Sequence, residues 1–197
     1  LCPCARLKLA GRKYSSSGIS ENAGFDRFNE SIFKDAEQLK RTRRAAEICA
    51  QYAENLEIGG AKGLLLMGET GLGKTFLMDS IGREAIRRGC SVKKYTAYNL
   101  IDAALRAVRR HEAGPELTGA ELLLLDDLGT EPMIPGVTIE TLFAAINERQ
   151  FAGKATVIAT NLTKNELFTQ YGERIFSRLF ASREYAAITL RGKDLRM

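Results

Sequence analysis

The segment GETGLGKT at residues 68–75 decides the fold of this chain. It matches the phosphate-binding pattern G-x-x-x-x-G-K-[ST] at every fixed position. The apolar run Leu64–Met67 before it is typical of a short buried strand, and residues 74–88 after it have a helical pattern that stops at Gly89. In such a unit, successive backbone N–H groups and the positive end of the helix dipole face a phosphate. The segment therefore predicts a nucleotide-binding site in an α/β fold.

Within this segment, Lys74 is expected to contact the β- and γ-phosphates of a nucleotide, and Thr75 is expected to ligate Mg²⁺. The alternative is a glycine-rich turn with a chance lysine, which does not account for the full match together with both flanking elements. The residues predicted to contact the nucleotide are continuous in the sequence: Gly68, Glu69, Thr70, Gly71, Leu72, Gly73, Lys74, Thr75 and Phe76.

A second motif, LLLLDD at residues 122–127, places two acids after a run of leucines. The leucines predict a fully buried strand, and ligands of open α/β sheets bind at the carboxyl ends of the strands. Asp126 is placed to hold Mg²⁺ through water, and Asp127 to orient an attacking water or accept its proton. The alternative is an Asp pair that caps a turn. Together with residues 68–75, the motif indicates a site that hydrolyses a nucleoside triphosphate.

Two weaker signals follow along the chain. Asn161 comes directly after the expected strand Thr156–Ala159, where its amide can hydrogen-bond a γ-phosphate or the attacking water; Thr-Asn is otherwise a common loop dipeptide. Arg174 and Arg178 are four residues apart and share one helix face. They are either a solvated basic face or a source of an arginine that enters a neighbouring subunit's site. The candidate catalytic residues are thus Lys74, Asp127, Asn161 and Arg178.

Strand and helix patterns alternate through the rest of the sequence, which predicts an α/β fold with a mainly parallel sheet. Helices are expected over 41–58, 74–88 and 99–110 and after a capping box at Thr163, and strands over 64–67, 91–95, 121–126, 156–159 and 185–190. Another helix is expected where Ile139, Leu142, Phe143 and Ile146 form an apolar stripe.

The composition excludes some classes of protein and leaves the partner open. No apolar run approaches the ~20 residues of a membrane-spanning helix, so no membrane partner is expected. With 29 Lys+Arg against 24 Asp+Glu, the net charge of +5 is compatible with a polyanion but does not prove one. The cysteines do not form a disulfide framework and no signal peptide is visible, so we expect a cytoplasmic location.

Taken together, these residues resemble the AAA+ ATPases of the bacterial DnaC/DnaI helicase-loader family, which are related to the DnaA initiator. The resemblance implies a P-loop AAA+ domain over residues 25–197, with a parallel sheet flanked by helices and a helical lid that is reduced or absent. It also implies ATP and Mg²⁺ as ligands. The segments that carry it are FDRFNESIF (25–33), LLLMGETGLGKTFL (64–77), LLLLDDLGTEPM (122–133), NERQ (147–150), IATNLTKNEL (158–167), YGERIFSRL (171–179) and GKDLR (192–196).

The same resemblance implies roles for several residues. Asn161 would be sensor 1, and Arg178 would be an arginine finger that acts in trans when the protein self-associates. The segment 25–33 would pack beside the adenine, or simply in the core. The helix 99–110 would line a channel for single-stranded DNA, with a basic side that binds phosphates or is an ordinary solvated face; this side consists of Arg106, Arg109 and Arg110.

Residues 1–24 mix basic residues with a Ser/Gly cluster and are expected to be a linker. The chain begins without methionine, at Leu1-Cys2-Pro3-Cys4, so we expect a longer protein. By resemblance, Cys2 and Cys4 would end an N-terminal Zn²⁺-binding region whose other ligands lie upstream, because a structural zinc site needs four ligands. The alternative is two incidental cysteines.

The function expected by resemblance is an ATPase that loads the replicative DNA helicase onto single-stranded DNA during replication initiation or restart. One alternative is a transposition ATPase of the IstB type, which would bind duplex DNA. Another is a nucleotide-dependent DNA-binding module that hardly turns over.

Overall fold

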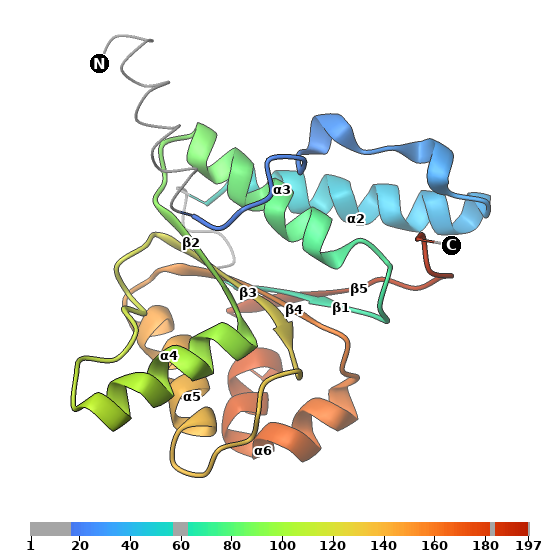
Figure 1. Cartoon of the computed structure of the whole chain (residues 1–197). Coiled ribbons are helices and arrows are strands. Elements are labelled where there is room, and N and C mark those ends of the chain that lie inside the picture. The colour runs from blue at the N-terminus through green and yellow to red at the C-terminus, as the bar shows by residue number, and fades with distance from the viewer. Residues whose placement is uncertain (1–16, 57–62, 182–183, 197) are drawn as a thin grey trace, which may run out of the picture.

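A parallel five-stranded sheet lies between two layers of helices in the computed structural model, which describes residues 17–56, 63–181 and 184–196 (Figure 1). The strand order is β2-β3-β4-β1-β5, and every pairing is parallel. The strands are β1 (Gly63–Met67), β2 (Val92–Thr96), β3 (Leu122–Leu128), β4 (Ala155–Thr160) and β5 (Tyr185–Thr189).

The helices divide between the two faces of this sheet. One face is covered by α2 (Ala36–Glu54) and α3 (Lys74–Arg87), which Figure 1 shows above the sheet. The other is covered by α4 (Ala97–Arg110), α5 (Thr138–Phe151) and α6 (Lys164–Phe180). The short 3₁₀ turns Phe25–Arg27 and Glu30–Ile32 precede α2.

The central strands form because their side chains are apolar on both faces. Leu64 and Leu66 of β1 pack into the core beneath α2 and α3, whereas Leu65 packs into the core beneath α4, α5 and α6. All three are at most 1% exposed. Complete burial of one leucine side chain stabilises the fold by roughly 1.5–3 kcal/mol, so continuous leucine runs specify strands covered on both sides.

The parallel register brings the functional segments to one edge of the sheet. Met67, the last residue of β1, pairs with Thr160 of β4, and Leu128 of β3 pairs with the same threonine. The loop after β1, the acids of β3 and the residue after β4 therefore leave the sheet side by side. This is the edge at which ligands of open α/β sheets bind.

The elements expected from the sequence are present, with ends shifted by a few residues. Helix α2 begins at Ala36 and not at residue 41, because the Asp35 carboxylate caps it by accepting the N–H of Glu37 at 2.9 Å. Gly172, with φ 74° and ψ 175°, breaks α6 into two helical pieces. No helix follows β5 within the described residues.

Residues 17–24 differ from the expected linker. Ile19 and Ala23 are 7% and 3% exposed, and the backbone N–H of Lys94 donates to the carbonyl of Ser17 at 2.9 Å. This part of the segment packs on the domain because it carries apolar residues at positions that meet α3 and β2. The boundary at residue 25 and the linker before residue 17 stay predictions. In the part of the chain that the structure describes, no helix is both long and apolar enough to cross a membrane.

Candidate nucleotide site

The loop between β1 and α3 has the backbone that phosphate binding requires. Gly73, with φ 86°, precedes the first residue of α3 in a left-handed conformation and provides no side-chain cap. The N–H groups at the start of α3 thus remain available to an anion, and the helix dipole favours negative charge there. Gly71 also has a positive φ, 79°, and a Cβ there would collide with the Asp194 side chain. The backbone conformation therefore favours glycine at both positions, and at Gly71 close packing does so as well.

This loop forms one wall of a pocket of about 390 Å³. Its lining includes three aromatic side chains, with the Phe28 ring 5.7 Å from Phe33 and 6.5 Å from Phe76 between centroids. It also includes charged and polar groups: Lys74, Thr75, Asp127, Asn161 and Arg196. Aromatic groups suited to a flat base and cationic groups suited to phosphates match the two halves of a nucleotide.

Lys74 is held inside the loop that precedes it. Its residue is 6% exposed, and its ammonium group donates to the carbonyl oxygens of Gly68 and Glu69, both at 2.7 Å. Burial lowers the pKa of Lys74, while the negative charges of Asp127 and Asp126 oppose that shift. These two hydrogen bonds position the ammonium at the loop.

Thr75 and Asp126 provide oxygen ligands suited to Mg²⁺. The Thr75 hydroxyl donates to Oδ1 of Asp126 at 3.2 Å, and the backbone N–H of Asp127 donates to the same oxygen at 3.1 Å. Mg²⁺ in phosphoryl-transfer sites usually takes one or two protein oxygens and completes its shell with phosphates and waters. This pair of oxygens beside the pocket therefore fits the ion.

Asp127 lies at an irregularity in β3. The register with β4 shifts between Leu125 and Leu128, and Asp127 has a φ of 54°, a left-handed conformation that aspartate tolerates better than most residues. The bulge turns its carboxylate into the pocket. Burial and the neighbouring charge of Asp126 raise the pKa of Asp127, and Lys74 opposes the shift. A raised pKa makes this carboxylate a better proton acceptor.

Asn161 follows β4 and also lines the pocket. It is fixed there by Thr160, whose hydroxyl donates to the carbonyl of Leu128 at 2.6 Å and accepts the N–H of Leu162 at 3.0 Å. Thr160 is completely buried, so the ends of β3 and β4 are tied together beneath the site. The structure thereby brings Lys74, Asp127 and Asn161 to one pocket.

The sequence profile of the IstB-like ATP binding proteins matches residues 47–180, which contain the site from the phosphate loop through Asn161. The chain belongs to this family. Curated proteins of three kinds are similar in sequence to this chain.

One relative is the chromosomal replication initiator protein DnaA of Zymomonas mobilis, which is 33% identical over 186 residues, or 90% of this chain and 36% of that protein. The replicative helicase loader DnaC of Escherichia coli is 25% identical over 178 residues, or 85% of this chain and 68% of the loader. A putative ATP-binding protein of insertion sequence IS5376 from Geobacillus stearothermophilus is 31% identical over 122 residues, or 60% and 46% of the two chains. The IstB-like chain thus spans about a third of DnaA and about two thirds of DnaC.

Solved structures give the same fold. A crystal structure of the DnaC helicase loader superposes with a TM-score of 0.71 at 21% identity and covers 87% of this chain and 98% of that one. AMPPCP-bound DnaA from Aquifex aeolicus also gives 0.71, at 22% identity and covering 91% and 54%. The IstB-like chain therefore has the AAA+ P-loop fold, as its sequence predicts.

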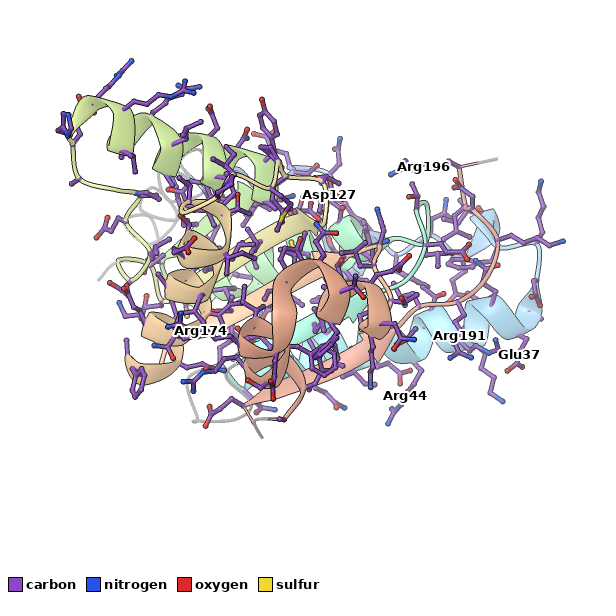
Figure 2. All side chains as sticks on the ribbon, turned by 90° about the horizontal axis from the view of Figure 1, so that it is seen from below. Glu37, Arg44, Asp127, Arg174, Arg191 and Arg196 are labelled. Carbon is purple, nitrogen blue, oxygen red and sulfur yellow. The ribbon has the colours of Figure 1, made fainter. Side chains whose placement is uncertain are left out.

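Arg174 and Arg178 of this IstB-like domain are not among the described residues that line the pocket. Their guanidinium carbons lie 3.7 Å and 5.9 Å from the ring centroid of Phe143 on α5. Figure 2 shows Arg174 well away from Asp127 and Arg196. The structure thus leaves both arginines outside the site of their own chain, and a role in trans stays a prediction.

Arg196, the last residue of the motif GKDLR, also lines the pocket, although the sequence alone predicts no role for it. After β5 the chain crosses the phosphate loop, where the N–H of Leu195 donates to the carbonyl of Gly71 at 3.1 Å. The Gln38 amide of α2 holds the crossing by donating to the carbonyl of Lys193 at 2.8 Å and accepting its N–H at 3.1 Å. Arg196 is the additional cation that this crossing provides.

The sequence predicts two other sites. Cys2 and Cys4 fall in residues 1–16, outside the described residues, and the described part contains no group of three or more His, Cys, Asp or Glu residues placed to hold a metal ion. On α4, Arg106 pairs with Asp102, while Arg109 and Arg110 are exposed near the end of the helix. The basic side of α4 therefore faces solvent.

Proposed function

We propose that this chain is the ATP-hydrolysing domain of a protein that loads the replicative DNA helicase onto single-stranded DNA. The observation that carries the proposal is the pocket in which Lys74, the Thr75–Asp126 pair, Asp127 and Asn161 converge. The relatives named as helicase loaders and as replication initiators support the replication context.

The proposed reaction is hydrolysis of the β–γ phosphoanhydride bond. The N–H groups of residues 68–75 and the ammonium of Lys74 bind the phosphate chain. Asp127 and Asn161 orient a water, and Asp127 accepts its proton as the water oxygen attacks the γ-phosphorus and the bond to the β-phosphate oxygen breaks. Arg196 adds positive charge at the phosphate end. Mg²⁺, held by Thr75 and Asp126, would supply charge neutralisation of the phosphate oxygens.

Arg178 of a neighbouring subunit is proposed to complete the site. Its position over Phe143, away from the pocket of its own chain, is compatible with presentation to another chain. An arginine finger contributes about 10³–10⁵ in rate where it has been measured, so a single subunit is expected to bind ATP but hydrolyse it slowly. An isolated chain with slow turnover would therefore behave as a nucleotide-dependent binding module.

A helicase pull-down tests the partner. The chain is immobilised with ATP, and the replicative helicase is expected to be retained together with single-stranded DNA. The control variant Glu140→Gln changes an exposed acid of α5 and should behave as wild type. If the helicase is not retained and the chain assembles on duplex DNA in the presence of ATP, the proposed loader function is contradicted.

The second candidate is an ATPase of insertion-sequence transposition that binds duplex DNA. It is favoured by the family profile and by the relative from IS5376, whose identity to this chain exceeds that of DnaC. Both candidates require the same ATP site and differ in the DNA and the protein partner. A cytoplasmic location and a Zn²⁺-binding region that includes Cys2 and Cys4 stay predictions.

A further inference from the structure

Lys94 joins two buried carboxylates behind the predicted magnesium site. Its ammonium group lies 2.7 Å from Oδ1 of Asp79 on α3 and 3.2 Å from Oδ2 of Asp126 on β3. The side chains are 12%, 3% and 5% exposed for Lys94, Asp79 and Asp126. Buried charges are costly unless they are paired, so this bridge is a structured feature and not a surface ion pair.

The bridge fixes the orientation of the Asp126 carboxylate. Oδ2 is held by Lys94, while Oδ1 accepts the Thr75 hydroxyl and the N–H of Asp127. Thr75 and Asp79 are four residues apart on α3 and therefore share the helix face that meets β3. Both oxygens of Asp126 thus have defined partners, and Oδ1 is directed toward Thr75.

The bridge also reaches the segment that enters the domain. The second oxygen of Asp79 accepts the N–H of Ser20 at 3.2 Å, and the backbone N–H of Lys94 donates to the carbonyl of Ser17 at 2.9 Å. Between these two contacts, Ile19 packs so closely on α3 that a Cβ at Gly82 would lie 2.5 Å from its Cδ1. A displacement of residues 17–20 would therefore disturb Asp79 and Lys94.

From these contacts we infer that Lys94 is a positioning residue for the metal-binding carboxylate Asp126, and that with Asp79 it couples the entering segment Ser17–Ala23 to the nucleotide site. The inference rests on the proposed ATP-binding function and adds to it a route by which whatever precedes residue 17 can regulate Mg²⁺–nucleotide binding. By linkage, the coupling acts in both directions: docking of the segment favours Mg²⁺–nucleotide, and Mg²⁺–nucleotide favours docking.

The test is the Mg²⁺ dependence of nucleotide binding by Lys94→Met, which keeps the length of the side chain and removes its charge. Affinity for a fluorescent ATP analogue is measured in EDTA and across a Mg²⁺ titration. Loss of a residue that hydrogen-bonds a metal ligand lowers metal affinity about 10–100-fold. The Mg²⁺ concentration that gives half of the maximal gain in nucleotide affinity should therefore rise roughly tenfold in Lys94→Met. Affinity in EDTA should stay as in wild type, a separation that a merely structural defect would not produce.

Matched variants complete the test. Lys93→Met changes the neighbouring lysine, which lies over the Tyr95 ring, and should leave the Mg²⁺ dependence unchanged. Lys94→Arg keeps the positive charge, so its Mg²⁺ dependence should be close to that of wild type. If Lys94→Met does not fold, Lys94→Arg and Ser20→Pro take its place. Ser20→Pro removes the N–H that donates to Asp79, so it should raise the Mg²⁺ concentration needed for tight nucleotide binding.

Amide exchange at Ser20 gives a readout independent of affinity. In wild type, Mg²⁺ with a non-hydrolysable ATP analogue should slow this exchange, and in Lys94→Met it should not. If wild type responds to Mg²⁺ and Lys94→Met responds equally, the inference is overturned while the proposed function stands. If wild type binds no nucleotide at all, the proposed function fails and the inference fails with it.

Discussion

At the scale of single residues, the site combines side chains that a local sequence motif predicts with others whose position depends on the tertiary structure. Lys74 and Thr75 occupy fixed positions of a short motif, and Asp126 and Asp127 follow a strand that the leucine run already defines. Arg196 has no such local signal. Its place in the pocket depends on the hydrogen bonds of Leu195 and Lys193 to segments far away in the sequence.

Replacement of Arg196 by alanine is predicted to weaken ATP binding. A hydrogen bond to a charged group contributes about 1.5–3 kcal/mol, which corresponds to roughly tenfold or more in affinity. Arg191→Ala is the matched control, because Arg191 belongs to the same C-terminal segment but is not among the described residues that line the nucleotide pocket. Equal affinities of the two variants in a titration with labelled ATP would show that Arg196 does not contact the nucleotide.

At the scale of elements, the sequence predicts the sheet and helices better than their ends and irregularities. Periodicity defines β1, β3 and α3 because apolar residues recur at the spacing of each element. The bulge at Asp127 and the break of α6 at Gly172 depend on φ values that the periodicity does not encode. The segment 17–24 has the composition of a linker and packs nonetheless, because Ile19 finds a tertiary partner in α3.

Arg149 of α5 is a buried charged side chain that ties together several segments of this layer. It is 0% exposed, and burial lowers its pKa to about 10. Its guanidinium donates five hydrogen bonds, at 2.6–3.0 Å, to the Thr156 hydroxyl and to the carbonyl oxygens of Leu117, Ala120, Glu121 and Ala155. These bonds hold the loop before β3 against the start of β4.

We predict that Arg149→Met lowers the free energy of unfolding by about 3 kcal/mol or more, since it leaves several buried acceptors without a donor. Urea denaturation followed by circular dichroism measures the loss. Arg44→Met is the control: Arg44 pairs with Glu47 on the surface of α2 with 67% of its side chain exposed, and such pairs contribute at most about 1 kcal/mol. Similar stabilities of the two variants would refute the structural role of Arg149.

At the scale of the whole molecule, the nucleotide pocket and the arginines of α6 lie in different places. The loop after β1, the acids of β3 and the C-terminal crossing form the nucleotide pocket at one edge of the sheet, whereas Arg174 and Arg178 of α6 lie near Phe143 of α5. Figure 2 shows Arg174 away from Asp127. In the proposed assembly, another chain supplies Arg178 to this pocket. The assembly is therefore expected to control turnover.

Mixed assemblies test this expectation. Arg178→Ala keeps an intact pocket but presents no finger, and Asp127→Asn presents the finger but lacks the proton acceptor. Each variant alone should hydrolyse ATP slowly, and a mixture should regain a substantial part of the wild-type rate, because Arg178 of one chain then serves the pocket of the other. A mixture no faster than the average of the separate variants would exclude action in trans.

The central claim is that this pocket hydrolyses ATP with Asp127 as the group that activates water. Its most direct test is the ATP turnover of wild type and Asp127→Asn, with and without single-stranded DNA and at saturating Mg²⁺. Asparagine keeps the shape of the side chain and tolerates the left-handed φ of 54°, so the variant should fold and bind ATP as wild type does. We predict that its turnover falls about 10²–10⁴-fold, as expected for the loss of a general base. Equal turnover by the two proteins would contradict the assignment of the site.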